Sequence, residues 1–320
     1  MHRIHAIPRR CRGMTLVELL AVCAIIGILA AMALPALSRA IARSRLTLCT
    51  NNQYQVAFAL LRYDEQYGSV PGWLNQLPLP AASGTVACSW TIPLLPFLGR
   101  NDVYDMILDR ANAATGLNLP NESRVEVFIC PANRAARTVT YPTHYTGNVG
   151  ASGTNANDGV FLNVFRGSPA ISLGDIADAD GSATTLAFAE KASFAFDPQA
   201  WTYSTTGAAA PVVAAFGAGT AVPPVFGVSG VPPSGPPVIN KASFLGFAPS
   251  SVHPGGAVVA FCDGHTGFLS DALQPYEYGQ LLTPKSRWSG VTNMTNSAAM
   301  QPWLLRSGQP YLLDEKILRP

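Results

Sequence analysis

The sequence predicts an α+β protein in which a long N-terminal helix packs against a mainly antiparallel β-sheet domain. Three features of the 320 residues indicate this class. An apolar run over residues 14–37 follows an arginine-rich segment, and helical periodicity continues from there to residue 67. From Gly72 onward the chain changes to short apolar runs separated by Pro, Gly and Asn, a pattern typical of strands and turns.

The N-terminal segment predicts a membrane-spanning helix. No acidic residue precedes Gly13, but four arginines do: Arg3, Arg9, Arg10 and Arg12. The apolar run after it carries only Glu18 as a charged group and, at about 1.5 Å per residue, is long enough to cross roughly 30 Å of hydrocarbon. Because basic residues stay on the cytoplasmic side, everything after Leu37 is expected outside the cytoplasm.

The order of these parts differs from that of a secretory signal, in which the cleavage site follows the apolar core. Here the cleavage point, Gly13, precedes the apolar run, so the mature protein would keep its membrane helix. The run from Gly13 through Met14 to Glu18 resembles the type IV prepilin motif. The resemblance implies that a prepilin peptidase and N-methyltransferase cuts after Gly13 and methylates Met14, where the family usually has Phe.

Two further residues in the apolar run receive roles from this resemblance. A carboxylate in a membrane segment costs about 2.5–3.5 kcal/mol and normally has a partner. For Glu18 the implied partner is the N-terminal amine of Met14 on a neighbouring subunit; the plainer interpretation is a tolerated charge near the helix start. Pro35 corresponds to the family's kinking proline, since a proline inside a helix removes one backbone hydrogen bond.

Residues 38–70 are expected to continue the helix into water as an extramembrane spine. Apolar residues recur there at helical spacing and form one inward stripe: Ile41, Cys49, Val56, Leu60, Tyr63 and Tyr67. Charged and amide residues fill the other sides. Gly68 is expected to end the helix, with Pro71 shortly after it. The stripe needs a partner surface, which the rest of the chain must supply.

Residues 71–284 predict the β-rich domain, with a short helix at Asn101–Arg110. The strand candidates are Val125–Cys130, Thr138–Tyr145, Gly159–Phe165, Thr184–Glu190 and Ala257–Phe261. Residues 205–240 carry no charge and seven prolines, so they are interpreted as an extended insertion or loop. The tail, residues 285–320, gives no clear signal.

Composition and motifs exclude several functions. Without the arginines of the leader, residues 1–13, the chain has 17 basic and 19 acidic side chains, which gives no basic surface for nucleic acid. No nucleophile elbow, HExxH helix or glycine-rich phosphate loop is present. The sequence therefore predicts a protein that is not an enzyme.

The β-rich part resembles a bacterial family of prepilin-like proteins that carry a histidine, nine residues and then Asp-Gly near the C-terminus. Here these are His253, Asp263 and Gly264. Other matching pieces are Cys49 with Asn51-Asn52, Tyr63 with Gly68 and Pro71, Ser89-Trp90, Phe128–Pro131, Tyr145 with Asn148, Gly159–Phe161, and Asp180-Gly181 with Glu190. The resemblance spans about residues 13 to 285 and implies an exported protein with a pilin-like fold, whose biochemical role is unassigned. Cys262 stands where the family more often has a small residue.

Four cysteines would face an oxidising compartment: Cys49, Cys88, Cys130 and Cys262. A Cys49–Cys130 bridge is favoured because it would pin the helix to the sheet domain, closing a loop of about 80 residues worth on the order of 4 kcal/mol. Cys88–Cys262 is a weaker pairing. Sequence alone leaves three connectivities open.

His253, Asp263 and His265 form the one cluster in the sequence that resembles a zinc or catalytic site. The alternative is a β-hairpin, with Asp263-Gly264 as a type I′ turn and His253 bonded to nearby backbone or to Asp263. This interpretation is favoured, because apolar alternation around Asp-Gly is typical of hairpins.

Asp175, Asp178 and Asp180 crowd one loop and could hold calcium, as in some secretion pseudopilins. A solvated turn with helix-capping aspartates is favoured, and no cofactor is expected.

Together these observations predict a pilin-like structural subunit of a pseudopilus, as in type II secretion, or of a related filament. Its partners would be the peptidase, other pilin-like subunits and the bacterial inner membrane, with the C-terminal domain periplasmic. The alternatives are a membrane-anchored module that binds polysaccharide or secreted protein and, more weakly, a zinc-dependent hydrolase. Which assembly the chain joins, and as major or minor subunit, is not encoded in these patterns.

Overall fold

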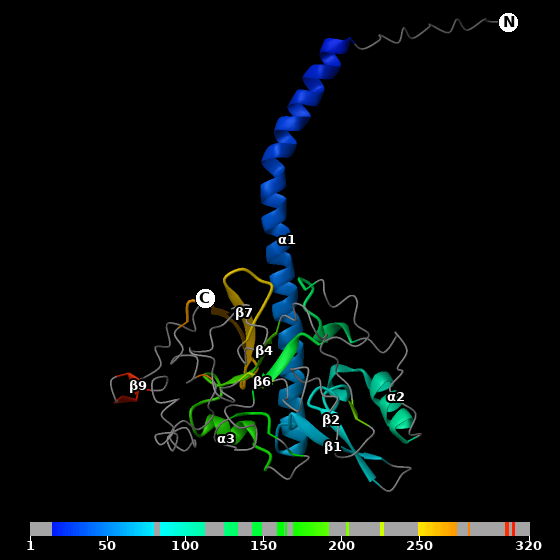
Figure 1. Ribbon diagram of the computed structural model, residues 1–320, viewed down its shortest axis with the longest axis vertical. Helices are drawn as coiled ribbons and strands as arrows, with labels where there is room; N and C mark the ends of the chain where they lie inside the picture. Colours follow the sequence, from blue (N-terminus) through cyan, green and yellow to red (C-terminus); the bar gives the residue numbers. More distant parts are fainter. Residues whose placement is uncertain are drawn as a thin grey trace, which may run out of the picture. The chain divides into compact units, whose positions relative to one another are not determined.

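The computed structural model describes residues 15–79, 84–112, 125–133, 143–148, 159–162, 164, 169–191, 203–204, 225–226, 249–273, 281, 305–306 and 309–310. Gly13 and Met14 lie outside these residues, as do most of the 205–240 insertion and most of the tail. The chain divides into two compact units, residues 1–44 and 45–320. The fold is α+β and pilin-like: a long N-terminal helix packs against a four-stranded antiparallel sheet (Figure 1).

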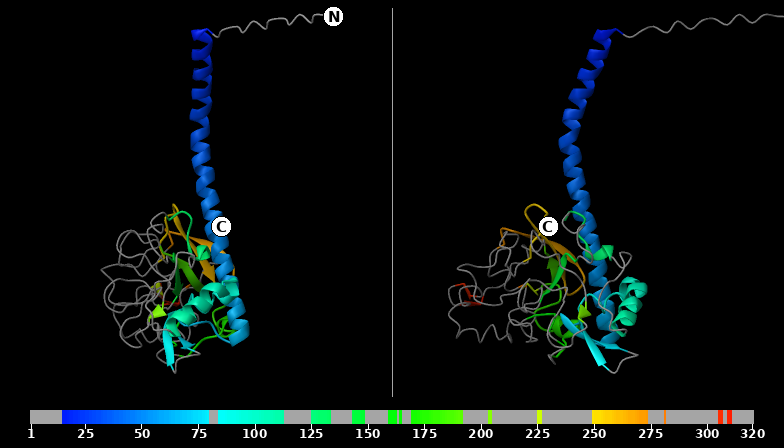
Figure 2. Two further views of the ribbon diagram at one scale, coloured as in Figure 1. Left: turned by 90° about the vertical axis from the view of Figure 1, so that its right-hand side faces the viewer. Right: turned by 45° about the vertical axis from the view of Figure 1, so that its right-hand side comes forward.

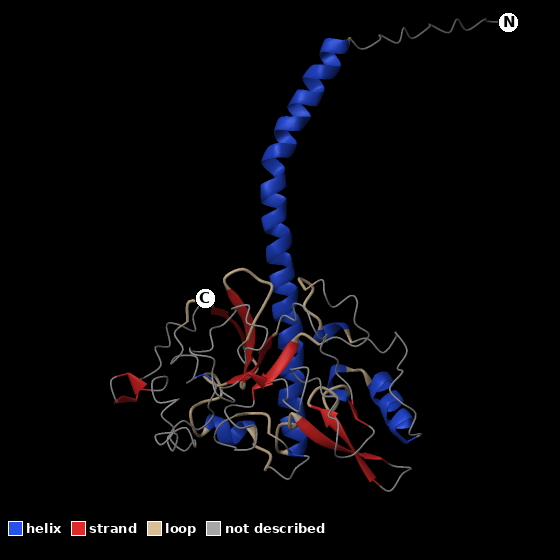
Figure 3. Cartoon of the chain, viewed as in Figure 1, coloured by secondary structure: helices blue, strands red, loops and turns tan. Residues whose placement is uncertain are grey.

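The long helix, α1, runs from Leu16 to Tyr67 and continues through Pro35. It ends where the sequence predicted, with Gly68 directly after it. The other helical elements are short: η1 (Pro96–Leu98), α2 (Asn101–Asn112), η3 (Glu126–Phe128) and α3 (Leu173–Ala177). Figure 3 shows helices in blue and strands in red.

The main sheet has the strand order β6-β3-β4-β7-β8. Its four antiparallel strands are β3 (Tyr145–Asn148), β4 (Leu186–Glu190), β7 (Gly256–Phe261) and β8 (Thr266–Ser270). The insertion adds β6 (Val225–Phe226), which pairs in parallel with β3. A second sheet, in the order β1-β2-β5, contains Leu74–Leu79, Gly84–Ser89 and Tyr203–Ser204. In the tail, β9 (Leu305–Arg306) pairs with β10 (Gln309–Pro310).

The C-terminal half of α1 is an integral part of the core of the second unit. Its buried residues are Cys49, Gln53, Val56, Ala57, Ala59 and Leu60. Gln53 anchors the helix to the sheet, since its side-chain amide donates to the Val258 carbonyl of β7 at 2.9 Å. The two views in Figure 2 show β4 and β7 beside this part of the helix. The sheet therefore supplies the partner surface that the apolar stripe requires.

The stripe is shorter than predicted. Ile41 and Tyr67, its expected ends, are 43% and 59% exposed. The buried face also contains a polar residue, Gln53, which the prediction did not include because it considered apolar residues only. The core includes an aromatic group in which the ring centroid of Trp90 lies 5.0 Å from that of Phe161 and 5.5 Å from that of Phe188.

Two strand predictions are wrong. Val125–Cys130 contains the single turn η3 in place of a strand, with Phe128 buried and Glu126 exposed. The described part of the second segment, residues 159–162 and 164, lies outside any strand. The amides of Val160 and Phe161 both donate to the Asn148 carbonyl, a sharing that a strand ladder does not make.

Other predictions agree better with the structure. The helix at Asn101 and the strands before Glu190 and Phe261 are confirmed within a few residues. Thr138–Tyr145 overlaps β3 only at Tyr145, and residues 138–142 lie outside the described part.

Candidate functional sites: the N-terminal helix and a buried Cys–Cys–Glu–His cluster

The first turn of α1 is closed by a reciprocal pair of side chains. The Glu18 carboxylate accepts from the Thr15 backbone amide at 2.8 Å and from the Thr15 hydroxyl at 3.0 Å. In return the Thr15 hydroxyl accepts from the Glu18 amide at 3.3 Å. This is a capping box, which satisfies backbone donors that a helix start leaves open. Glu18 is exposed, so its carboxylate can also meet a partner from outside the chain.

After this cap, α1 presents apolar side chains on every side. The large ones that are exposed include Leu16, Val17, Leu19, Leu20, Val22, Ile25, Ile26, Ile28, Leu29, Met32, Leu34 and Leu37. Among the described residues α1 is the one helix whose length and composition allow it to cross a membrane, and none of its most apolar stretch is buried. A helix that is apolar all round needs lipid or other helices around it.

The structure has Cys49, Cys88, Cys130 and Cys262 as buried free thiols. Neither predicted disulfide is therefore formed in the described part of the chain. Cys49 and Cys130 nevertheless lie close together, as their pairing would require, because α1 and the segment after η3 meet there. Each sulfur contacts the other and also meets a further group.

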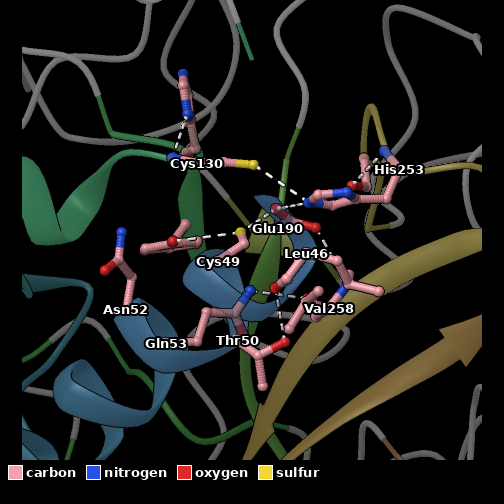
Figure 4. A network of polar contacts seen from close by, with 12 residues as sticks. Leu46, Cys49, Thr50, Asn52, Gln53, Cys130, Glu190, His253 and Val258 are labelled. Carbon is pink, nitrogen blue, oxygen red and sulfur yellow. Dashed lines mark hydrogen bonds and ion pairs between the residues drawn. The ribbon is translucent and has the colours of Figure 1, made fainter. Parts of the chain in front are cut away.

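Those groups are Glu190 and His253 (Figure 4). The Cys49 thiol donates to Glu190 Oε1 at 2.6 Å, and Cys130 Sγ lies 3.4 Å from His253 Nε2. His253 Nε2 is 3.6 Å from Glu190 Oε1. All four ligand atoms lie within 4.8 Å of one another, and all four residues are buried.

Four separate segments position these side chains. Cys49 comes from the first buried turn of α1, Cys130 from the residues after η3, Glu190 from the end of β4, and His253 from the loop before β7. The surroundings hold them in place: Glu190 Oε2 accepts from the Val258 amide at 3.1 Å, and the His253 amide donates to Ser251 Oγ at 3.0 Å. These protein contacts hold the four side chains in a site that is shielded from solvent.

The pKa values follow from these contacts. Burial opposes ionisation of Glu190, but hydrogen bonds from His253, Cys130 and Cys49 outweigh it and lower its pKa. Burial likewise disfavours a charged His253, yet its hydrogen bonds to Cys130 and Glu190 raise its pKa to about 9. The hydrogen bond between Cys49 and Cys130 lowers the pKa of Cys130 and raises that of Cys49. Both shifts favour an ionised Glu190 and a protonated His253 in the absence of another cation.

The ligand set His253, Asp263 and His265 is not assembled. His265 pairs with Asp263 at 2.6 Å and stacks on Phe261 at the partly exposed end of the β7–β8 hairpin. His253 lies before β7 and Asp263 after it, and a six-residue strand is about 20 Å long. The hairpin interpretation is confirmed. Its turn lies one residue earlier than predicted: the Gly264 N–H donates to the Phe261 carbonyl, so the two central residues are Cys262 and Asp263. The His253 side chain contacts Cys130 and Glu190, whereas nearby backbone or Asp263 was expected.

The three loop aspartates do not converge as metal ligands within the described residues. Asp175 caps α3: its carboxylate accepts from the Ser172 amide at 3.3 Å, and Ser172 Oγ accepts from the Asp175 amide at 3.0 Å. Asp178 follows as the C-terminal cap of the same short helix.

Sequence reasoning missed the four-residue cluster. Cys49, Cys130 and His253 were each singled out, but Glu190 was noted only as the end of a strand and as one piece of the family resemblance. One signal was available: a glutamate that ends a fully apolar strand, Leu186–Glu190, is expected to be buried and to need a partner.

In comparisons with known proteins, two family models match separate parts of the chain. The family described as "Protein of unknown function (DUF1559)" matches residues 39–276, which include the whole cluster. The model described as "Prokaryotic N-terminal methylation motif" matches residues 8–34. Searches of curated proteins and of solved structures found no match.

Proposed function

The chain belongs to the DUF1559 family and carries a prokaryotic N-terminal methylation motif, and we propose that it is a pilin-like subunit that assembles through α1 into a pseudopilus or a related thin filament. The motif indicates processing by a prepilin peptidase, and the apolar helix behind it indicates a membrane-anchored, extracytoplasmic protein. Cleavage after Gly13 and methylation of Met14 are the specific form of this processing.

One observation carries the proposal. The segment behind the motif is a helix with apolar side chains exposed on every side, interrupted by a single carboxylate in its first turn. A membrane satisfies the apolar surface but leaves the carboxylate without a partner, at a cost that reaches about 2.5–3.5 kcal/mol at the bilayer centre. A bundle of such helices satisfies both, because the free amine of a neighbouring Met14 can pair with Glu18.

Assembly then proceeds without a catalytic step in this chain. The helices leave the bilayer of the inner membrane by packing against one another, each Glu18 neutralises an amine and fixes the register, and the β-rich domain lies on the outside of the filament. Residues 71–284 would decide what the filament contacts. No role for nucleic acid is proposed.

The capping box makes a sharp test, because Glu18 has a local role as well as the proposed one. Glu18→Gln keeps an acceptor for the Thr15 amide and removes the charge, whereas Thr15→Ala removes the hydroxyl and keeps the charge. We expect Glu18→Gln to be processed normally but to give no cross-linked oligomers in cells, and Thr15→Ala to assemble. Cleavage is measured on gels as the decrease in apparent mass that removal of the leader causes.

The opposite pattern would contradict the proposal. If Glu18→Gln assembles as well as the unaltered chain while Thr15→Ala fails, Glu18 acts only as a helix cap. If neither variant nor the unaltered chain forms oligomers after cleavage, the protein is a processed membrane anchor rather than a filament subunit.

A further inference from the structure

We propose that Cys49, Cys130, Glu190 and His253 form a structural zinc site that fastens α1 to the sheet domain. This inference does not depend on filament assembly, because all four residues lie in the second compact unit. Its basis is the convergence of four ligand atoms of the types that zinc prefers, two sulfurs, one imidazole nitrogen and one carboxylate oxygen.

The distances fit a tetrahedral ion. Zinc bonds of about 2.3 Å to sulfur and about 2.0–2.2 Å to nitrogen and oxygen place neighbouring ligand atoms roughly 3.3–3.8 Å apart. Cys130 Sγ and His253 Nε2 are 3.4 Å apart, and His253 Nε2 and Glu190 Oε1 are 3.6 Å apart. The 2.6 Å contact between Cys49 Sγ and Glu190 Oε1 must open by about 1 Å when the shared proton leaves, and all six pairs already lie within 4.8 Å.

The charge of the site also fits. Zinc binding displaces one proton from each thiol, and a third if His253 is protonated, and leaves two thiolates, one carboxylate and a neutral imidazole around a divalent cation. Glu190 is 1% exposed, and a carboxylate so deeply buried requires a cation nearby. The ion supplies that cation without requiring the imidazole to stay charged.

A Cys49–Cys130 disulfide is the competing use of the same residues, but it accounts for less. It would need the two sulfurs about 2.05 Å apart and would engage two of the four groups. In the structure each sulfur, besides its contact with the other, meets a further group, Glu190 for Cys49 and His253 for Cys130 (Figure 4). A metal ion uses all four.

Outer contacts hold the ligands in the required orientation, as they do in known zinc sites. The Val258 amide fixes Glu190 Oε2 at 3.1 Å and leaves Oε1 directed into the cluster. The Tyr145 hydroxyl lies 3.5 Å from Cys49 Sγ, and the Cys130 amide donates to His144 Nδ1 at 2.8 Å. With four protein ligands and buried surroundings, the site has the closed form of a structural ion rather than the open form of a catalytic one.

The test uses the full chain, purified in detergent without reductant or chelator after growth with added Zn²⁺. Elemental analysis should find about one zinc per chain. Cys130→Ser and His253→Ala should each reduce this ratio at least tenfold. The matched controls are Cys88→Ser, a buried cysteine elsewhere in the core, and His265→Ala, a histidine outside the cluster; both should keep the zinc.

A second measurement covers the case in which a variant fails to fold. In the unaltered protein, Cys49 and Cys130 should react with a thiol reagent only after a chelator removes the metal, and peptide mapping without reductant should find them unbridged. A Cys49–Cys130 disulfide in metal-free protein would overturn the proposal. So would metal-free protein with both thiols free, or zinc retained by both ligand variants.

Discussion

Two glycines at the ends of β7 allow a controlled measurement of how tightly α1 packs on the sheet domain. Gly255 directly precedes β7 and Gly264 lies in the turn after it, with φ of 86° and 90°, a region that disfavours other residues. A Cβ at Gly255 would meet nothing within 4 Å, whereas a Cβ at Gly264 would lie 2.7 Å from Leu61 Cδ1 of α1. The two sites therefore share the backbone cost and differ in the clash.

The expected magnitudes follow from this difference. An alanine at positive φ costs about 1–2 kcal/mol, partly offset by about 0.4–1 kcal/mol because the unfolded chain loses freedom. Gly255→Ala should therefore destabilise by about 1 kcal/mol. Gly264→Ala should cost about 1 kcal/mol more, since Leu61 must leave its preferred rotamer. At about 2–4 °C per kcal/mol, Tm should fall by about 2–4 °C and about 4–8 °C respectively.

Thermal unfolding of the full chain in detergent, followed by circular dichroism, measures both values. Combining Gly264→Ala with Leu61→Ala isolates the clash: it should recover about 1 kcal/mol relative to the sum of the two single changes. Equal losses for Gly255→Ala and Gly264→Ala would refute the packing of Leu61 against this turn. No loss in either would refute the backbone conformation as well.

Three further predictions concern the core and the cluster. Phe188→Ala, in the buried aromatic group, should cost about 3–5 kcal/mol, while Phe268→Ala, 40% exposed, should cost less than about 1 kcal/mol in the same assay. Gln53→Ala leaves a buried carbonyl of β7 without its donor and should cost about 1–3 kcal/mol, measured by urea unfolding; an unchanged midpoint would contradict this bond. In reduced, metal-free protein, hydrogen bonds outweigh burial and raise the pKa of His253 from 6.5 to about 9, so its stabilisation is complete below pH 6.5 and is lost as the pH rises through about 9. The unfolding free energy should fall by up to about 3 kcal/mol across this interval, and His253→Gln should abolish the slope; a slope that survives would assign it to other groups.

The long helix and the hairpin were predictable because their signals are local. A cleavage motif before an apolar run, helical spacing after it and Asp-Gly between apolar segments all act over a few residues. The Val125–Cys130 prediction was wrong because alternation over six residues also fits a single turn, in which Phe128 is buried and Glu126 reaches water. Short apolar alternation does not distinguish these conformations.

The cluster was not predictable from spacing, because its ligands come from segments far apart in the chain: the Cys49 and Glu190 atoms that touch are separated by 141 positions. His253 was grouped with Asp263 for their nearness in sequence, yet the intervening strand β7 carries them apart. Glu190 ends β4 and His253 precedes β7, and the antiparallel pairing of these two strands brings the two residues together.

The central claim is that the chain keeps its apolar helix after processing and uses it for assembly. Mass spectrometry of the N-terminal peptide of the protein from cells with a prepilin peptidase tests this most directly. We predict a mature chain that begins at an N-methylated Met14 with Glu18 and the helix intact. An unprocessed leader, or a chain that begins beyond Leu37, would contradict it.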